Sequence, residues 1–212
     1  MNTVNQVKDF SEVIHGRRAV KKYNPDYKIS REEIIEILEE ATLAPSAFNL
    51  QPWRFVVIES EKGKEELLEI APFNSSQINT SSAVIAVFGD LTFVDRAEEI
   101  YTETAEHGYI SLEMKDKMLA TIVPLYNRYS IDEKRESVIL DSGLVSMQLM
   151  LTAHARGFAT NPMSGFNKEK IAVLLELDPE RYVPVLIISI GKAASEARPS
   201  VRLPVSGITE WK

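Results

Sequence analysis

Cysteine is absent from all 212 residues of this sequence. Its absence excludes disulfide bonds, thiolate metal sites and cysteine nucleophiles, and it is compatible with a reducing compartment. The sequence also contains no Gly-x-Gly-x-x-Gly motif after a strand pattern and no phosphate-binding loop that ends in Gly-Lys-Ser or Gly-Lys-Thr. The residues therefore support neither a Rossmann-type nicotinamide site nor a nucleotide site of the second kind.

Histidine is scarce, and positive charge is in the minority. The three histidines stand far apart at positions 15, 107 and 154, so we expect core or surface side chains rather than a metal centre. The formal net charge of −7 at pH 7 argues against general nucleic-acid binding, which needs a basic face. Any anionic ligand of this chain must therefore be held by a local cluster of cations.

Long apolar runs are missing as well. The longest, Ala83–Phe88 and Val183–Ile190, are too short to span a bilayer, and the polar stretch Met1–Arg18 lacks the apolar core of a secretion signal. We therefore expect a cytoplasmic protein without a membrane span. Because 44% of the residues are apolar and no linker or repeat interrupts the chain, the composition predicts one domain over residues 1–212.

Apolar spacing and capping residues predict a mixture of helices and strands. Ser30 and Glu33 form a capping box, and the helix that they open should end at Ala44 because Pro45 cannot continue its hydrogen bonds. Other helices are expected over Phe10–Arg17, Glu61–Ala71, Phe93–Glu106, Leu112–Arg128 and Glu133–Gly157, and strands over Trp53–Glu59, Ser82–Gly89 and Tyr182–Gly191.

Two segments suggest an interface. Val138–Ala153 is apolar on nearly every face, so we expect a helix that is buried all round in a core or at a subunit interface and that helps to form a dimer. The polar arm Lys192–Lys212 shows no periodicity, yet it carries apolar side chains such as Val201 and Trp211. Because such side chains are unfavourable in water, we expect the arm to dock on another surface, of which a partner subunit is one candidate.

The segment from Arg17 to Lys22 is basic and reads Arg-Arg-Ala-Val-Lys-Lys. In an extended chain Arg17, Ala19 and Lys21 share one side, and Arg17 and Lys21 lie about 13 Å apart. One cation could then hold a phosphate while the other reaches the far end of a mononucleotide. The alternative is that the arginines favour a helix C-terminus and the lysines are solvated.

The loop Ala44–Trp53 reads Ala-Pro-Ser-Ala-Phe-Asn-Leu-Gln-Pro-Trp and connects an expected helix to an expected strand. It offers short polar side chains, and Pro52 should force Gln51 into an extended conformation. Loops of this kind commonly carry binding groups. The alternative is a helix stop followed by an Asn turn, with Trp53 buried in the core.

Together and in this order, the basic segment and the loop resemble the nitroreductase family of flavoenzymes. That family opens with an Arg-Arg-Ser-x-Arg-like segment, and a Pro-Ser-Ser-x-Asn-x-Gln-Pro-Trp-like loop precedes its first strand. The loop matches at Pro45, Ser46, Asn49, Gln51, Pro52 and Trp53. Weaker matches follow at Asn74 and Gln77, the Ser81–Ile85 strand, the Asp141-Ser-Gly helix, Asn161–Phe166 and Arg202–Pro204. The matches cover nearly the whole chain, and their order argues against chance.

The resemblance implies an α+β fold with a central mixed or antiparallel sheet flanked by helices. It also implies an intertwined homodimer in which the arm 192–212 docks on the partner and two FMN sites lie at the interface. NADH or NADPH would pass a hydride to flavin N5 and leave, and an oxidised small molecule such as a nitroaromatic or a quinone would then be reduced. Because the flavin carries this chemistry, we expect no general acid or nucleophile among the residues.

The same resemblance implies the flavin ligands, position by position. Arg17 and Arg202 would grip the phosphate, since a guanidinium offers a bidentate charged contact, and Lys21 would lie near the pyrimidine edge. The other candidates are Arg18 and Ala19 in the basic segment, Pro45, Ser46, Ala47 and Asn49 from the other subunit, Asn74 and Gln77 at the ring edge or ribityl chain, and the backbone of Met163, Ser164 and Gly165 along the reactive face.

Several positions depart from the family's pattern. Ala19 and Ala47 each replace a usual serine, so two hydroxyl contacts are missing, and Gln77 stands where some relatives carry lysine. These departures leave the substrate preference and the redox potential open. The alternatives are another flavin chemistry on the same scaffold, such as that of a dehalogenase or a flavin-fragmenting enzyme, a flavin-binding sensor or carrier without turnover, and a helical interaction protein without a cofactor.

Overall fold

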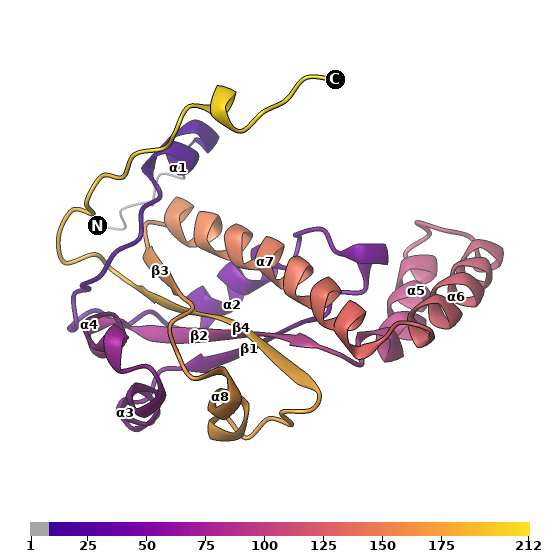
Figure 1. Cartoon of the computed structure of the whole chain (residues 1–212), viewed down its shortest axis with the longest axis horizontal. Coiled ribbons are helices and arrows are strands. Elements are labelled where there is room, and N and C mark those ends of the chain that lie inside the picture. The colour runs from indigo at the N-terminus through magenta and orange to yellow at the C-terminus, as the bar shows by residue number, and fades with distance from the viewer. Residues whose placement is uncertain (1–8) are drawn as a thin grey trace.

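Four strands form one sheet in the computed structural model, which describes residues 9–212. Residues 1–8, the first part of the segment considered for a secretion signal, lie outside the described residues. The strands β1 (Trp53–Ile58), β2 (Ala83–Asp90), β3 (Ala159–Met163) and β4 (Tyr182–Gly191) lie in the order β1-β2-β4-β3. Each neighbouring pair is antiparallel (Figure 1). The predicted α+β fold is confirmed, and within the described residues its sheet is antiparallel rather than mixed.

Helices cover both faces of the sheet (Figure 1). On one face, α2 (Arg31–Ala41) and α7 (Ile131–Ala155) pack against strand residues such as Ile85 and Ile188. On the other face, α3 (Glu61–Ile70), α4 (Ser75–Thr80) and α8 (Lys168–Leu174) pack against residues such as Val84 and Ile187. Successive β2 residues therefore enter opposite cores, as the alternation of side chains along a strand requires.

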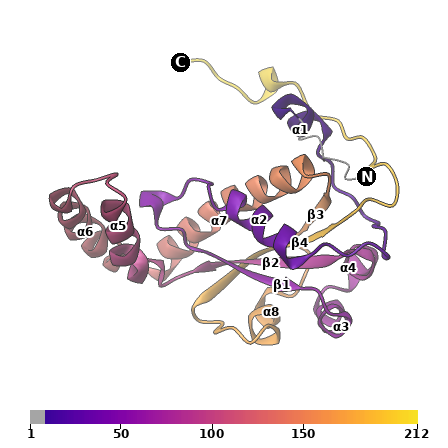
Figure 2. The same ribbon diagram turned by 180° about the vertical axis from the view of Figure 1, so that it is seen from behind.

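The remaining helices lie at the two ends of the sheet. A short 3-10 turn, η3 (Phe93–Arg96), leads into α5 (Ala97–Glu106), which packs with α6 (Leu112–Asn127) around a third apolar cluster at one end. At the other end, α1 (Phe10–Gly16) contacts α7 and lies away from the sheet (Figures 1 and 2). The candidate site residues are divided between these two ends of the sheet.

Two kinds of sequence prediction needed correction. The capping box at Ser30 opens α2 as predicted, but the helix ends at Ala41, because Leu43 and Ala44 continue as tight turns that donate to Glu40 and Ala41. The strand β3 and the helices α4 and α8 were not predicted. β3 contains Pro162, a residue that sheets tolerate at an edge, and β3 is indeed an edge strand.

Helix α7 is buried on one side only in the single chain, so burial all round stays a prediction that needs a subunit interface. Its inner face includes Val145 and Leu149, which pack on the sheet, whereas Leu140 and Leu144 on its outer face are 67% and 42% exposed. By length and composition alone, α7 is also the one helix within residues 9–212 that could cross a membrane. Because it lies along the sheet and buries its inner face there, we interpret it as a core helix.

The carboxyl-terminal arm runs away from the body of the chain. Residues 198–212 are all exposed, and Val201 and Trp211 are among the most exposed apolar side chains of residues 9–212. Figures 1 and 2 both show the arm passing near α1 and ending free of the sheet and its helices. The start of the arm pairs with its own chain at Tyr23 and Ala193, but the expected docking of the apolar side chains of residues 198–212 is not provided by it.

Candidate functional site

The basic segment lies along the outer edge of β3. Arg17 caps the C-terminus of α1 in an extended conformation, and Ala19 forms a parallel bridge with Thr160. The amide of Val20 donates to the carbonyl of Thr160 at 3.0 Å, and the Asn161 Nδ2 donates to the carbonyl of Val20 at 3.1 Å. The backbone of the segment is therefore held by the sheet, which leaves its cationic side chains available for a ligand.

Arg17 at this edge lies within electrostatic range of two other guanidinium groups, those of Arg18 and Arg202. Arg17 and Arg18 are half-buried, and the pKa of Arg17 is lowered by burial and by the positive charges of Arg18 and Arg202. Within residues 9–212, none of these three arginines, nor Lys21, has a carboxylate at ion-pair distance. Unpaired and mutually repelling cations favour an anionic ligand, and the predicted partners Arg17 and Arg202 are brought together across the fold.

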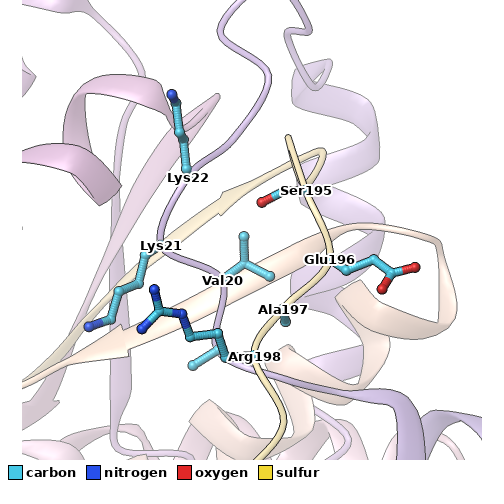
Figure 3. A pocket seen from close by; sticks show the side chains of 8 residues that line it. Val20, Lys21, Lys22, Ser195, Glu196, Ala197 and Arg198 are labelled. Carbon is cyan, nitrogen blue, oxygen red and sulfur yellow. The ribbon is translucent and has the colours of Figure 1, made fainter.

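A pocket of about 370 Å³ opens between the basic segment and the start of the arm (Figure 3). It is lined by residues 19–22 and 195–198, and Figure 3 shows the side chains of Lys21 and Arg198 extending towards the same side. A neighbouring pocket of about 240 Å³ is lined by Arg17, Arg18 and the same part of the arm. Arg198 was not predicted, although a second arginine close before Arg202 in the arm was a usable signal.

Helix α4 and the end of β3 complete this half of the site. Asn74 donates from Nδ2 to the carbonyl of Gly165 at 2.9 Å, and the Ser76 hydroxyl donates to the carbonyl of Lys21 at 3.0 Å. Asn74 and Gln77 are both buried, with 9% of each residue exposed. These two bonds join Lys21 of the basic segment to α4, and Asn74 at the N-cap of α4 to the turn of Ser164 and Gly165, which follows Met163 at the end of β3.

The loop that follows α2 is tightly wound. Its 3-10 turn, η1 (Ala47–Asn49), holds Phe48 at a φ of 51° and Asn49 at 56°, and Gln51 follows at 48°. The prediction of an extended Gln51 is therefore wrong, because the Ser46 hydroxyl accepts from the Gln51 amide at 3.0 Å and closes the turn. Non-glycine residues with positive φ are strained and gather at functional sites.

Two side chains from other helices hold this loop. Asp141 of α7 accepts from the amide of Ala47 at 3.1 Å through Oδ2, and the Tyr101 hydroxyl of α5 donates to the carbonyl of Phe48 at 3.0 Å. Asp141 is only 5% exposed, and burial raises the pKa of its carboxyl, although the Ala47 amide acts in the opposite direction. Neither residue was given a role from the sequence, and an ionisable residue within an apolar helix was the signal available.

The predicted site residues fall into two separate groups. Pro45, Ser46, Ala47 and Asn49 lie with α5 and the first half of α7, whereas the basic segment and α4 lie at the opposite end of the sheet (Figure 1). Figure 2 shows the same separation from behind. One chain therefore does not unite the two groups.

A groove of about 440 Å³ opens beside the loop. It is lined by Asn49 and Gln51 together with residues of α5 and its C-terminal turn, where the His107 and Tyr109 rings stack at 5.7 Å. Apart from Asn49 and Gln51, the residues that line the groove lie between Arg96 and Tyr109.

Known proteins resemble this chain over almost its whole length. A family model described as the nitroreductase family matches residues 14–192. YdgI of Bacillus subtilis (strain 168), to which NAD(P)H nitroreductase activity is provisionally assigned, is 53% identical over 204 residues, which cover 96% of this chain and 98% of YdgI. The identity to YdgI and the coverage of both chains show common ancestry and a common fold.

Two crystal structures share the fold. One, from Exiguobacterium sibiricum 255-15, is described as a nitroreductase in complex with FMN; it is 49% identical, covers 97% of this chain and 98% of its own, and superposes with a TM-score of 0.94. The other, SE1966 from Staphylococcus epidermidis, is provisionally described as an NAD(P)H:FMN oxidoreductase; it is 45% identical, covers 100% of both chains and has a TM-score of 0.96.

Proposed function

This chain belongs to the nitroreductase family, and on that premise we propose that it is an NAD(P)H-dependent flavin oxidoreductase with FMN as its bound cofactor. The observation that carries the proposal is the group of cations Arg17, Arg18 and Arg202 without a carboxylate partner, on the same basic segment that α4, with the buried amides of Asn74 and Gln77, contacts at Lys21. A flavin mononucleotide has a phosphate for the first set and polar ring and ribityl atoms for the second. The residues present therefore fit this cofactor.

Arg17 and Arg202 bind the phosphate, and Arg18 adds positive charge beside them. Burial first, and then repulsion by Arg18 and Arg202, lowers the pKa of Arg17; a dianionic phosphate would offset the repulsion and stabilise the arm next to the basic segment. Because Arg202 lies in the exposed arm, the phosphate site is also the place where the arm becomes ordered on the body of the protein.

Lys21, α4 and the turn after β3 hold the rest of the cofactor. Lys21 places a positive charge near the pyrimidine edge, where Asn74 and Gln77 supply amide groups to the ring edge or ribityl chain. The backbone of Met163, Ser164 and Gly165 lies along the reactive face. When bound, FMN would supply the redox chemistry by which NADH or NADPH is oxidised and an oxidised acceptor is reduced.

The two separated groups of site residues meet in a homodimer. The outer face of α7 offers Leu140, Leu144 and their apolar neighbours to a second copy, and each arm carries its apolar side chains to the partner. Each of the two flavin sites then takes the basic segment and α4 from one subunit. The loop residues Pro45, Ser46, Ala47 and Asn49 come from the other.

Nitroaromatic compounds and quinones are the acceptors we propose. NAD(P)H and the acceptor use the same open face of the cofactor in turn, so a single groove serves both and no bound nicotinamide site is required. The residues of this chain orient the two molecules and stabilise charge on the reduced cofactor, and none is needed as a nucleophile. Oxidation of NADH or NADPH that depends on an added nitro compound or quinone tests turnover, and its absence would leave a flavin carrier.

The cofactor assignment is tested by Arg202→Ala. Loss of one charge-assisted phosphate contact of about 1.5–3 kcal/mol should raise the FMN dissociation constant roughly 10-fold to 100-fold, measured by quenching of flavin fluorescence. Arg128→Ala, at an exposed position after α6, is the matched control and should bind FMN as the unaltered protein does. Full occupancy of the Arg202→Ala protein at limiting FMN would refute the phosphate assignment.

A further inference from the structure

We propose that Asp141 is a positioning residue for the flavin: it holds the loop 45–51, with the help of Tyr101, in the conformation in which the loop meets the cofactor of the partner subunit. This inference rests on the proposed function, because it needs the loop to belong to a shared flavin site. It assigns a role to a buried carboxylate that the chemistry of the reaction does not use.

The loop cannot hold its conformation through its own sequence. Phe48, Asn49 and Gln51 all have positive φ, and none of them is glycine. Residues in this region persist only where the surroundings determine their conformation. Within the loop, the Ser46 carbonyl and hydroxyl accept from the Asn49 and Gln51 amides. From outside the loop, Asp141 accepts from the Ala47 amide and Tyr101 donates to the Phe48 carbonyl, at the two residues where the turn begins.

Asp141 is an unexpected residue at its place in α7. Its neighbours on the buried side include Val138 and Val145, where an apolar side chain would avoid the unfavourable burial of charge. The bond from the Ala47 amide is the one hydrogen bond recorded for this carboxylate within residues 9–212. A buried carboxylate with this single bond stabilises the loop more directly than it stabilises the helix.

The position of Asp141 also links the loop to the dimer. It directly follows Leu140, whose side chain belongs to the outer face of α7, and its own side chain points to the loop. The helix that pairs the two subunits therefore also sets the part of the flavin site that each subunit offers to the other. Misplacement of the loop should weaken FMN binding without altering the pairing of the helices.

The experiment compares three substitutions in the full-length holoprotein. Asp141→Leu removes the acceptor while keeping a similar volume, and it should raise the FMN dissociation constant about tenfold, in line with the loss of one hydrogen bond to a charged group. Asp141→Asn keeps an oxygen that can accept from Ala47 and should stay within about threefold of the unaltered protein. Ser142→Ala is the matched control, because the Ser142 hydroxyl is buried without a hydrogen-bond partner within the described residues.

Thermal unfolding of the FMN-free dimer separates positioning from a general structural role. Rescue of FMN affinity by Asp141→Asn supports the proposal, and equal affinities for Asp141→Leu and the unaltered protein overturn it. Should Asp141→Leu fail to fold, Tyr101→Phe removes only the hydroxyl that reaches Phe48 and should weaken FMN binding about threefold. Unchanged FMN binding in that variant would likewise overturn the proposal.

The result also distinguishes this inference from the proposed function. If the unaltered protein binds no FMN, the proposed function fails. If the unaltered protein binds FMN tightly and the variants do not differ from it, only the role of Asp141 is refuted.

Discussion

Two regions of the molecule differ in whether their charged and apolar groups find partners within one chain. They are the sheet, and the outer surface of α7 together with the arm. At the end of β2, the buried Asp90 accepts two hydrogen bonds from Arg181, at 2.9 and 2.8 Å, and pairs with Arg54 at 2.9 Å. By contrast, Arg17 and Arg202 meet no carboxylate within the described residues, and the apolar groups of α7 and the arm face water. These unsatisfied groups support the proposed second subunit and the anionic cofactor.

Leu144→Glu should have the largest effect on this contrast. A carboxylate in the middle of the outer face of α7 would have to lose its hydration in the dimer, so we expect a monomer that no longer retains FMN. Val173→Glu, on the exposed side of α8 beyond the opposite face of the sheet, is the control and should remain a dimer. Sedimentation velocity measures both variants, and a Leu144→Glu dimer with bound FMN would contradict the proposed interface.

Asp90→Asn should affect folding stability and leave the cofactor site intact. Removal of the negative charge leaves Arg181 and Arg54 without their partner, and because both are partly exposed we expect a loss of about 3 kcal/mol in the free energy of unfolding. Urea unfolding at a fixed protein concentration measures this loss. The FMN dissociation constant of the folded variant should not change, and a large change would contradict the separation of core and site.

The same substitution should also change the response to acid. Burial by itself would raise the pKa of Asp90, but Arg181, Thr92 and Arg54 outweigh it and hold the pKa below its ordinary value of 3.8. A carboxyl with a lowered pKa stabilises the fold above its ordinary pKa, and this contribution is lost as the pH falls towards the folded pKa. Asp90→Asn should therefore flatten the loss of stability below about pH 4.

Individual helices and strands, and the site residues of the basic segment, could be predicted from the sequence because each depends on short sequence patterns. The capping box at Ser30 opens α2, and the branched residues of Ala83–Phe88 form most of β2. Arg17, Lys21 and Asn74 were selected by a family resemblance, and a hydrogen bond from Ser76 of α4 to the Lys21 carbonyl joins the basic segment to the helix that follows Asn74. These features depend on neighbours in the chain or on short motifs.

Other features depended on contacts between distant residues, which a single sequence does not reveal. Asp141 meets Ala47 only after α7 packs beside the loop, and the short edge strand around Pro162 is defined by its pairing with β4. The positive φ of Gln51 follows from the closed turn rather than from Pro52. The exposure of Leu140 could not be foreseen either, because an apolar helix looks the same whether the chain or its partner covers it.

The smallest expected effect concerns a single hydroxyl in the site. Ala19 stands at an exposed position beside the phosphate-binding arginines, where relatives usually carry serine. Ala19→Ser should restore one hydrogen bond to the cofactor and tighten FMN binding about threefold to tenfold, from a net contribution of about 0.5–1.5 kcal/mol. Ala120→Ser, at an exposed position of α6 far from the basic segment, should leave FMN binding unchanged. Because neither hydroxyl enters the core, both variants should unfold at the same temperature as the unaltered FMN-free protein.

Weaker FMN binding by Ala19→Ser would show that the missing hydroxyl is an adaptation to a different position of the cofactor. The assignment of this edge of β3 to the phosphate end of FMN would then have to be abandoned.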